Sequence, residues 1–149
     1  MDFESLFSPW RPYVLSILRI VTGLLFLEHA TSKLFGFPAT GFHPALLSIF
    51  GVAGVIELFG SLLLIFGLYT RPAAFILSGE MAVAYFLVDA PHSFYPLVNH
   101  GDPVILFCFV YLYIAAAGPG PWSLDHRRAV RAPGVASAVA ESRPARGLD

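Results

Sequence analysis

Four long apolar stretches follow one another along the chain, separated by links that are rich in Gly, Pro or polar residues. A helix needs about 20 mostly apolar residues to cross a lipid bilayer. The stretches predict spans at about residues 13–34, 45–69, 72–88 and 103–117, of which the last two are short. The pattern therefore predicts an all-α fold, a four-helix transmembrane bundle.

Individual residues mark where these spans begin and end. Gly67 is typical of a helix C-terminus, and Pro72 is a favourable first helical residue. Asp102 is expected to be the N-cap of the fourth span, which Gly-Pro-Gly-Pro at 118–121 then ends. The predicted organisation is an N-terminal segment at 1–12, a membrane domain at 13–125 and an Ala/Arg/Pro-rich disordered tail at 126–149.

The composition supports a membrane location. Hydrophobic residues make up 56% of the chain and charged residues 13%, with a mean hydropathy of +0.70. A soluble domain carries about 25% charged residues, so this chain has too few to cover a water-exposed surface. It has no basic patch with interleaved aromatic residues, which argues against nucleic acid as a partner. Cys108 is the one cysteine, which excludes an internal disulfide and dithiol chemistry.

The basic residues favour one orientation. Arg11 precedes the first predicted span, Arg71 separates the second from the third, and Arg127 follows the fourth. The 89–101 link has neither Lys nor Arg. By the positive-inside rule, both termini are expected in the cytoplasm. The acidic start of the chain and the lack of a small-x-small cleavage site favour a first span that is retained as a signal anchor.

Several ionisable residues fall inside the predicted spans. Each costs about 2.5–3.5 kcal/mol at the centre of a span. At about 100° per residue, Arg19, His29 and Lys33 share one stripe of the first span, together with Thr22 and Phe26. The second and third predicted spans form a hairpin, so Glu57 in the second and Glu80 in the third should lie at similar depth in the membrane. We therefore expect the stripe to pack against both, giving an intramembrane polar cluster of Arg19, His29, Lys33, Glu57 and Glu80.

Two interpretations of this cluster stay open. Buried ion pairs can serve only to specify how helices pack. Ionisable residues in a membrane also mark ligand sites and proton routes, so the cluster is a candidate site for a ligand, a quinone or a proton. In the 89–101 link, Asp89, His92 and Asn99 are further candidates. The spaced histidines of the links are interpreted as surface residues, and no metal site and no catalytic residue is predicted.

Four sequence blocks resemble the DoxX family of small bacterial membrane proteins. Residues 23–36, GLLFLEHATSKLFG, are similar to the family pattern Phe-Leu-x-His-Gly-x-x-Lys-Leu-Phe-Gly, with Ala30 where Gly is usual. Residues 54–71, GVIELFGSLLLIFGLYTR, resemble its Glu-x-x-Gly-Gly…Gly-x-x-Thr-Arg signature, with Ser61 for the second Gly. Residues 80–86 with 91–101, and 115–125, resemble the remaining two blocks, although Asp89 or His92 stands near a position where His is usual.

The resemblance implies a multi-pass protein of the bacterial inner membrane. Members that gave the family its name are similar to small subunits of a thiosulfate:quinone oxidoreductase or a quinol oxidase, and other members look like membrane partners of redox or thiol-stress enzymes. The expected function is thus a membrane subunit or anchor of a quinone-linked oxidoreductase system, at most an accessory subunit, since no residue here carries electrons by itself. The expected partners are the lipid bilayer, a redox enzyme and further copies of the chain.

In this interpretation quinone is the candidate cofactor. His29 and Lys33 would donate hydrogen bonds, Glu57 and Glu80 would hold or relay protons, and three aromatic residues would flank the ring, namely Phe26, Phe59 and Tyr85. The alternatives are a small-solute or proton-coupled transporter and a non-catalytic membrane scaffold.

Overall fold

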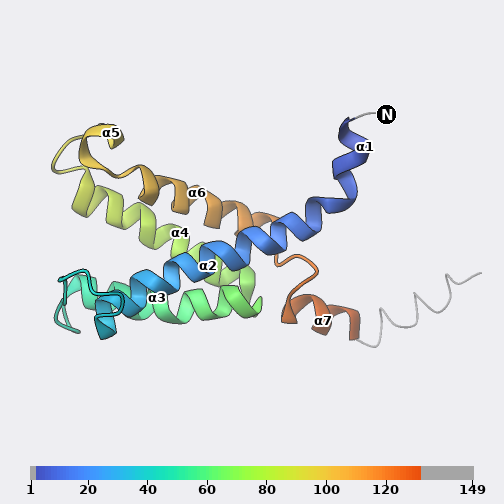
Figure 1. The fold of residues 1–149 in the computed structure, drawn as a ribbon, viewed down its shortest axis with the longest axis horizontal. Helices are drawn as coiled ribbons and strands as arrows, with labels where there is room; N and C mark the ends of the chain where they lie inside the picture. Colours follow the sequence, from blue (N-terminus) through green and yellow to red (C-terminus); the bar gives the residue numbers. More distant parts are fainter. Residues whose placement is uncertain (1–2, 132–149) are drawn as a thin grey trace, which may run out of the picture.

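The computed structural model describes residues 3–131, and within that range the chain forms helices and connecting turns without a β-strand. The all-α prediction is confirmed. The elements in order are α1 (Phe3–Phe7), η1 (Ser8–Trp10), α2 (Arg11–Phe35), α3 (Ile49–Phe66), α4 (Thr70–Ala84), the π-helical η2 (Tyr85–Asp89), α5 (Pro96–Asn99), α6 (Asp102–Ala117) and α7 (Leu124–Arg131) (Figure 1).

Three helical stretches of the described chain are long and apolar enough to cross a membrane. They are Ser5–Phe35, Ile49–Phe66 and Thr70–Asp89. The fourth predicted span corresponds to α6, which is apolar but has 16 residues. At about 1.5 Å per residue, α6 is about 24 Å long, less than the roughly 30 Å hydrocarbon core of a bilayer.

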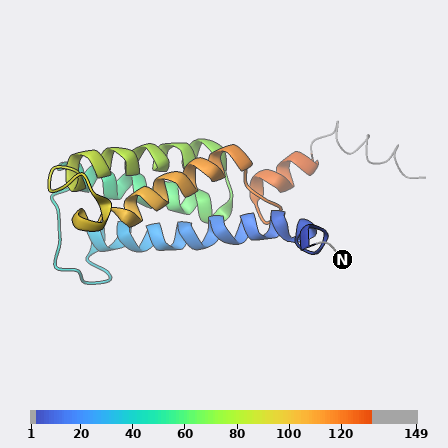
Figure 2. The ribbon, with the colours of Figure 1, turned by 90° about the horizontal axis from the view of Figure 1, so that it is seen from above.

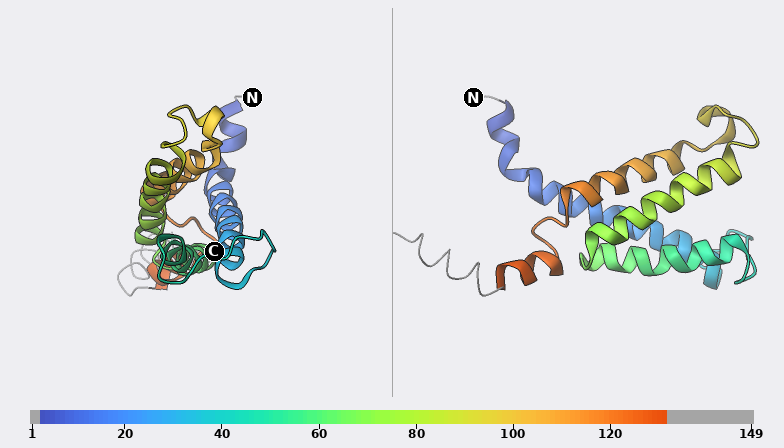
Figure 3. Two further views of the ribbon diagram at one scale, coloured as in Figure 1. Left: turned by 90° about the vertical axis from the view of Figure 1, so that its left-hand side faces the viewer. Right: turned by 180° about the vertical axis from the view of Figure 1, so that it is seen from behind.

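The four long helices are arranged as two pairs. Helix α2 packs along α3, and α4 packs along α6, whereas α2 and α6 meet at few positions (Figure 2). The turn at 67–69 joins α3 to α4, and these two helices diverge from it toward their far ends (Figure 3, right). We call the end with this turn the turn end, and the end with the links 36–48 and 90–101 the wide end.

Helix α3 is shorter than the predicted span at 45–69. Residues 45–48 form a turn in which the Ser48 N–H donates to the Ala45 carbonyl, 2.9 Å away. The Ser48 hydroxyl then caps the helix by accepting from the Gly51 N–H at 3.2 Å. Because this side chain satisfies a free N–H of the first turn, α3 begins only at Ile49. At its other end Gly67 has a φ of 65°, which confirms it as the C-terminal cap.

Helix α4 begins at Thr70 rather than at Pro72, for a reason that lies far along the chain. The carboxylate of Asp125 accepts from the N–H groups of Tyr69, at 3.0 Å, and Thr70, at 2.9 Å. It therefore acts as an N-cap supplied by a remote segment. The prediction for Asp102 is also corrected: Gly101 is the N-cap of α6, and Asp102 is its first helical residue.

The two ends of the chain differ from the prediction in part. The predicted N-terminal segment at 1–12 is helical where it is described, and α2 already begins at Arg11. The predicted disordered tail at 126–149 overlaps α7, so that prediction is wrong for residues 126–131. Helix α7 has apolar residues and arginines at helical spacing, which gives it two distinct faces. Residues 132–149 lie outside the described residues.

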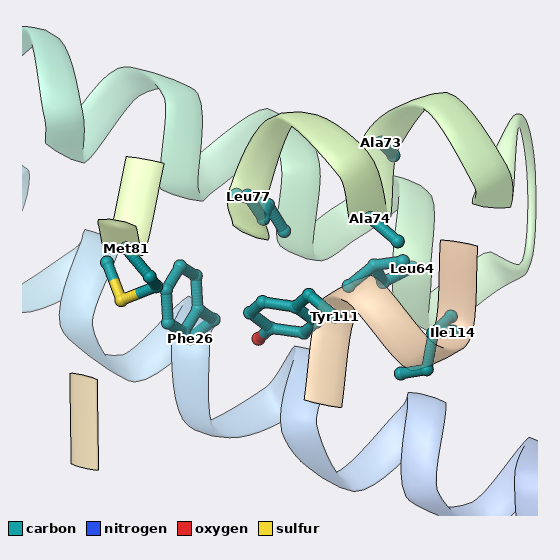
Figure 4. Packing of buried hydrophobic residues seen from close by; sticks show 8 residues of the cluster. All are labelled: Phe26, Leu64, Ala73, Ala74, Leu77, Met81, Tyr111 and Ile114. Carbon is teal, nitrogen blue, oxygen red and sulfur yellow. The ribbon is translucent and has the colours of Figure 1, made fainter. Parts of the chain in front are cut away.

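The core lies where the two helix pairs are close together, and it uses residues of all four long helices. Phe26, Tyr111 and Ile114 are at most 2% exposed, and Leu64 and Leu77 are fully buried. These side chains pack with Ala73, Ala74 and Met81 into one cluster (Figure 4). The buried Tyr111 hydroxyl donates to the Thr22 carbonyl at 3.0 Å, so this polar atom is satisfied inside the core.

Candidate functional site

A cavity of about 520 Å³ lies beyond the core, toward the wide end, between the two helix pairs. Phe26 and Met81 belong both to the core cluster and to the cavity wall, so the cavity begins where the core ends (Figure 4). Its lining comes from α2, α3, α4, η2, α6 and the 36–48 link and is mostly apolar. The ionisable residues in the lining are His29, Lys33, Glu57, Glu80 and Asp89.

An ion pair crosses the cavity wall from α2 to α3. Lys33 Nζ lies 2.5 Å from Glu57 Oε1, with 21% of the lysine side chain and 2% of the glutamate side chain exposed. Gly54, one turn before Glu57, makes this approach feasible. A Cβ atom at position 54 would lie 3.3 Å from the Lys33 Cβ, which is tighter than usual packing.

Three buried carboxylate oxygens of the cavity have no hydrogen-bond partner within the described chain. Glu57 Oε2 and both oxygens of Glu80 are buried and make no hydrogen bond. Glu80 nevertheless interacts electrostatically with Glu57 and Lys33, which places the three groups near one another. A buried acceptor without a donor costs about 1–3 kcal/mol, and native structures contain few of them. These three atoms are therefore the strongest indication of a binding site.

His29 lines the same cavity, and one of its ring nitrogens makes a hydrogen bond within α2. Nδ1 lies 2.8 Å from the Leu25 carbonyl. Because a carbonyl oxygen only accepts, Nδ1 carries the hydrogen, and Nε2 of the neutral ring is an acceptor. The ring also lies edge-on to Phe107, with centroids 6.4 Å apart. Together, Glu57 Oε2, the Glu80 carboxyl group and His29 Nε2 make the cavity rich in acceptors.

Arg19 does not join the cluster, and the prediction that it packs against the two acids is wrong. Its side chain is fully buried at the turn end. Nε donates to the Pro119 carbonyl at 2.9 Å, and the two Nη atoms donate to the carbonyls of Leu64, Ile65 and Trp122. The C-terminal carbonyls of α3 carry partial negative charge, so they attract the guanidinium as a carboxylate would. Arg19 thus ties α2 to the end of α3 and to the segment after α6.

Of the three candidates in the 89–101 link, one reaches the cavity. Asp89, the last residue of the π-helical η2, lines it. The His92 Nδ1 bonds the Val88 carbonyl at 2.8 Å, one turn back. The Asn99 side chain donates to the Ser93 carbonyl and accepts from the Gly101 N–H, each at 2.7 Å, so it shapes the link. Within residues 3–131, no group of three or more His, Cys, Asp or Glu residues could hold a metal ion.

The aromatic side chains around the cavity differ from those expected. Phe59 is 62% exposed and Tyr85 donates its hydroxyl to the Phe94 carbonyl at 2.7 Å, and neither lines the cavity. Phe26 does, as predicted. The lining includes three further aromatic residues that the sequence did not single out, Phe42, Phe50 and Phe107. Phe42 lies in an irregular link, and α6 is apolar on all sides, so no periodic pattern could have identified them.

A second, smaller cavity of about 260 Å³ adjoins the first near the wide end. It shares His29, Lys33 and Phe42 with the larger cavity. Its other lining residues are Glu28, Ser32, Pro38 and Thr40, so it is more polar. Lys33 and His29 therefore separate an apolar cavity from a polar one.

Comparison with known proteins identifies the family. The family model described as DoxX matches residues 14–90, which hold α2 from its fourth residue onward, α3, α4 and η2, with all five ionisable cavity residues. The chain belongs to the DoxX family. It is a membrane protein with apolar helices that contact lipid. This DoxX chain is also 44% identical, over 128 residues, to a protein of Haemophilus influenzae (strain ATCC 51907 / DSM 11121 / KW20 / Rd) that is described only as an uncharacterized protein. The match covers 79% of this chain and 92% of that relative. No solved structure gives a significant match.

Proposed function

We propose that this DoxX protein binds a quinone in the large cavity and serves as the membrane subunit or anchor of a quinone-linked oxidoreductase system. The observation that carries the proposal is an apolar cavity of about 520 Å³ with a Lys33–Glu57 ion pair and the unpartnered Glu80 carboxyl group in its wall. Ligand sites are typically apolar cavities of about 300–1,000 Å³ with a few convergent polar groups.

Access from the bilayer supports a lipid-soluble ligand. Several cavity residues on α3, α4 and η2 are also exposed apolar residues of the protein surface, so the cavity reaches the surface that lipid covers. These residues are Val52 at 49%, Ile56 at 36%, Ile76 at 56%, Val83 at 54% and Leu87 at 58% exposed. A quinone with an isoprenoid tail can enter between α3 and α4 and leave its tail in the lipid.

The polar groups of the cavity are of the kinds that a quinone headgroup needs, namely a donor for a ring carbonyl and acceptors for protons. Lys33 retains N–H groups beyond the one that bonds Glu57 and can donate to a ring carbonyl. The carboxyl groups of Glu57 and Glu80 can accept protons when the ring is in its reduced form. Phe26 and Phe107 can pack against the ring faces. The electrons come from a partner enzyme, since a carboxylate, an amine and an imidazole only bind and exchange protons.

The proposal includes four spans and cytoplasmic termini in the bacterial inner membrane. Helix α6 packs along α4 for its length and so extends across the same layer. Arg11, Arg71 and Arg127 all lie at the turn end, and the links of the wide end carry no Lys or Arg. The positive-inside rule then places the turn end in the cytoplasm.

A proton-coupled or small-solute transporter is the second candidate function. It is supported by the polar cavity that shares His29 and Lys33 with the large one, because a solute route needs an aqueous opening beside its membrane site. Solute flux into liposomes without a bound quinone would favour this function, and an absence of both would favour a non-catalytic scaffold.

Quinone binding can be measured directly. The full chain in lipid nanodiscs is titrated with decylubiquinone, and the quenching of Trp fluorescence is followed. Lys33→Met and Phe107→Ala should each weaken binding about tenfold or more, the first through a lost donor and the second through lost ring packing. Glu28→Gln is the matched control, since Glu28 is exposed and lies outside the large cavity. Quenching that is absent, or equal in all four proteins, would refute the proposal.

A further inference from the structure

The large cavity holds more acidic than basic side chains. Its wall holds three acidic residues, Glu57, Glu80 and Asp89, and one lysine, Lys33. Lys33 is committed to Glu57 at 2.5 Å. His29 bonds the Leu25 carbonyl through Nδ1 and makes no hydrogen bond to Glu80. The described residues therefore give the Glu80 oxygens no donor, although both are buried.

Two kinds of ligand would satisfy Glu80 unequally. A quinone carbonyl is an acceptor, so it can bond Glu80 only through the O–H of a neutral carboxyl group, and it leaves the second oxygen without a donor. A protonated amine offers both a positive charge and two or three N–H donors, and hydrogen bonds between two ionised groups are about twice as strong as neutral ones. In an apolar surrounding the attraction is stronger than in water. The complement to Glu80 is thus an ammonium group.

We propose that the large cavity binds a lipophilic ammonium, an amine with an aromatic or alkyl body, whose N–H groups donate to Glu80. This inference goes beyond quinone binding and does not depend on it. The amine would be held at Glu80 on α4, and the Lys33–Glu57 pair between α2 and α3 would stay intact.

The shape and lining of the cavity define the body of the amine. The side chains around Glu80 are apolar, so a strongly hydrated inorganic cation or a polyamine is disfavoured. Phe26 and Phe107 face the cavity with rings whose centroids are 5.2 Å apart. An aromatic body can pack on them, and their negative faces also favour a nearby cation. Entry between α3 and α4, beside the exposed Ile56 and Val83, suits an amphiphile.

A pair of ligands of nearly equal shape tests the charge requirement. The fluorescent amine 1-naphthylmethylamine and the neutral alcohol 1-naphthylmethanol are titrated into nanodiscs that hold the full chain, with empty nanodiscs as the blank. The amine should bind the native protein at least about tenfold more tightly than the alcohol. Equal affinities for the two ligands would overturn the proposal, whatever the behaviour of any variant.

The variant Glu80→Gln tests whether this residue supplies the preference. It keeps the side-chain shape and should reduce the ratio of amine to alcohol affinity to about one. Glu28→Gln, which changes an exposed acid on α2, should keep the ratio of the native protein. A ratio that survives in a folded Glu80→Gln protein would assign the charge elsewhere and overturn the proposal. If Glu80→Gln fails to fold, Glu80→Leu, which also removes the acidic group, replaces it, and an unchanged ratio in that variant overturns the proposal as well.

Competition separates this inference from quinone binding. The naphthyl amine is titrated in the presence and in the absence of decylubiquinone. Amine binding with no quinone binding supports the present inference and removes the quinone proposal. Quinone binding together with equal affinities for the amine and the alcohol supports the quinone proposal and refutes the ammonium proposal.

Discussion

Lys33 on α2 is paired with Glu57 on α3 at 2.5 Å, and this contact joins the two helices of one pair at the wall of the cavity. Lys33→Met would leave the Glu57 carboxylate, which is 2% exposed, without a counter-charge. Removal of one partner from a buried ion pair costs about 3–5 kcal/mol. The midpoint of thermal unfolding in mild detergent should fall accordingly.

The double variant Lys33→Met with Glu57→Leu is the informative control for this pair. It replaces both charges by apolar groups of similar size, which is often neutral or stabilising. It should recover most of the stability that Lys33→Met loses. A double variant as unstable as the single one would show that the charge pair is not the source of the effect.

Arg19 holds the turn end together through four backbone carbonyls. Arg19→Met leaves those carbonyls without their donor and should cost about 3 kcal/mol or more in the free energy of unfolding. Arg19→Lys should recover little, since an ammonium cannot present a planar fork of donors. Unfolding by denaturant, followed by Trp fluorescence, measures both variants. Full recovery by lysine would argue that only the charge matters.

Asp125 sets the start of α4, so its replacement should affect a helix that lies 55 residues away in sequence. Asp125→Ala removes the acceptor for the N–H groups of Tyr69 and Thr70 and should cost about 0.5–2 kcal/mol. Asp125→Asn retains one side-chain oxygen as an acceptor, so its stability should lie between those of the native protein and Asp125→Ala. Hydrogen exchange at the amides of Tyr69 and Thr70 should become faster in the alanine variant. Unchanged exchange there would contradict the capping role.

Two glycines provide a matched pair for the packing of α3 against α4. A Cβ atom at Gly60 would lie 2.7 Å from the Leu77 side chain, whereas one at Gly79 would meet no atom within 4 Å. Gly60→Ala should destabilise by about 1–3 kcal/mol through overpacking. Gly79→Ala should stabilise by roughly 0.5–1 kcal/mol, because alanine favours the helix. Thermal unfolding of the two variants should therefore shift in opposite directions, and a shift in the same direction would refute this account.

Membrane topology can be tested with single cysteines in a Cys108→Ala background. Ser93 lies in the link at the wide end, and Arg128 lies on α7 beyond the turn end. With cytoplasmic termini, Ser93→Cys should react with a membrane-impermeant maleimide in intact spheroplasts, and Arg128→Cys only after lysis. The reverse labelling pattern would invert the proposed orientation.

Much of the fold could be predicted from the chain because bilayer thickness and helix periodicity act locally. Arg19, Thr22 and Phe26 are buried on one face of α2, as their spacing predicted. Gly67 ends α3, as a residue that tolerates a left-handed backbone should. The element types follow from such short-range rules, whereas several boundaries do not.

What the sequence did not give depends on contacts between distant segments. The carboxylate of Asp125 reaches the start of α4 only in the folded chain, so no local pattern places that cap. Arg19 was expected beside the acids because opposite charges attract, yet the carbonyls at the end of α3 lie closer to it. Periodicity assigns a residue to a face but leaves its depth and its partner open. Lys33, near the other end of the same stripe, forms an ion pair with Glu57, one of the two acids that the stripe was expected to contact.

The turn that joins α3 to α4 connects the two helix pairs at one end of the molecule, far from the wide end. Helix α3 has 18 residues and is about 27 Å long. A rotation of about 5° at the turn would move the far end of α3 by about 2 Å. This distance is about half the van der Waals thickness of an aromatic ring. Arg19 and Asp125 bind the chain around this turn, so a change in the angle between α3 and α4 would be largest at the wide end, where the cavity lies.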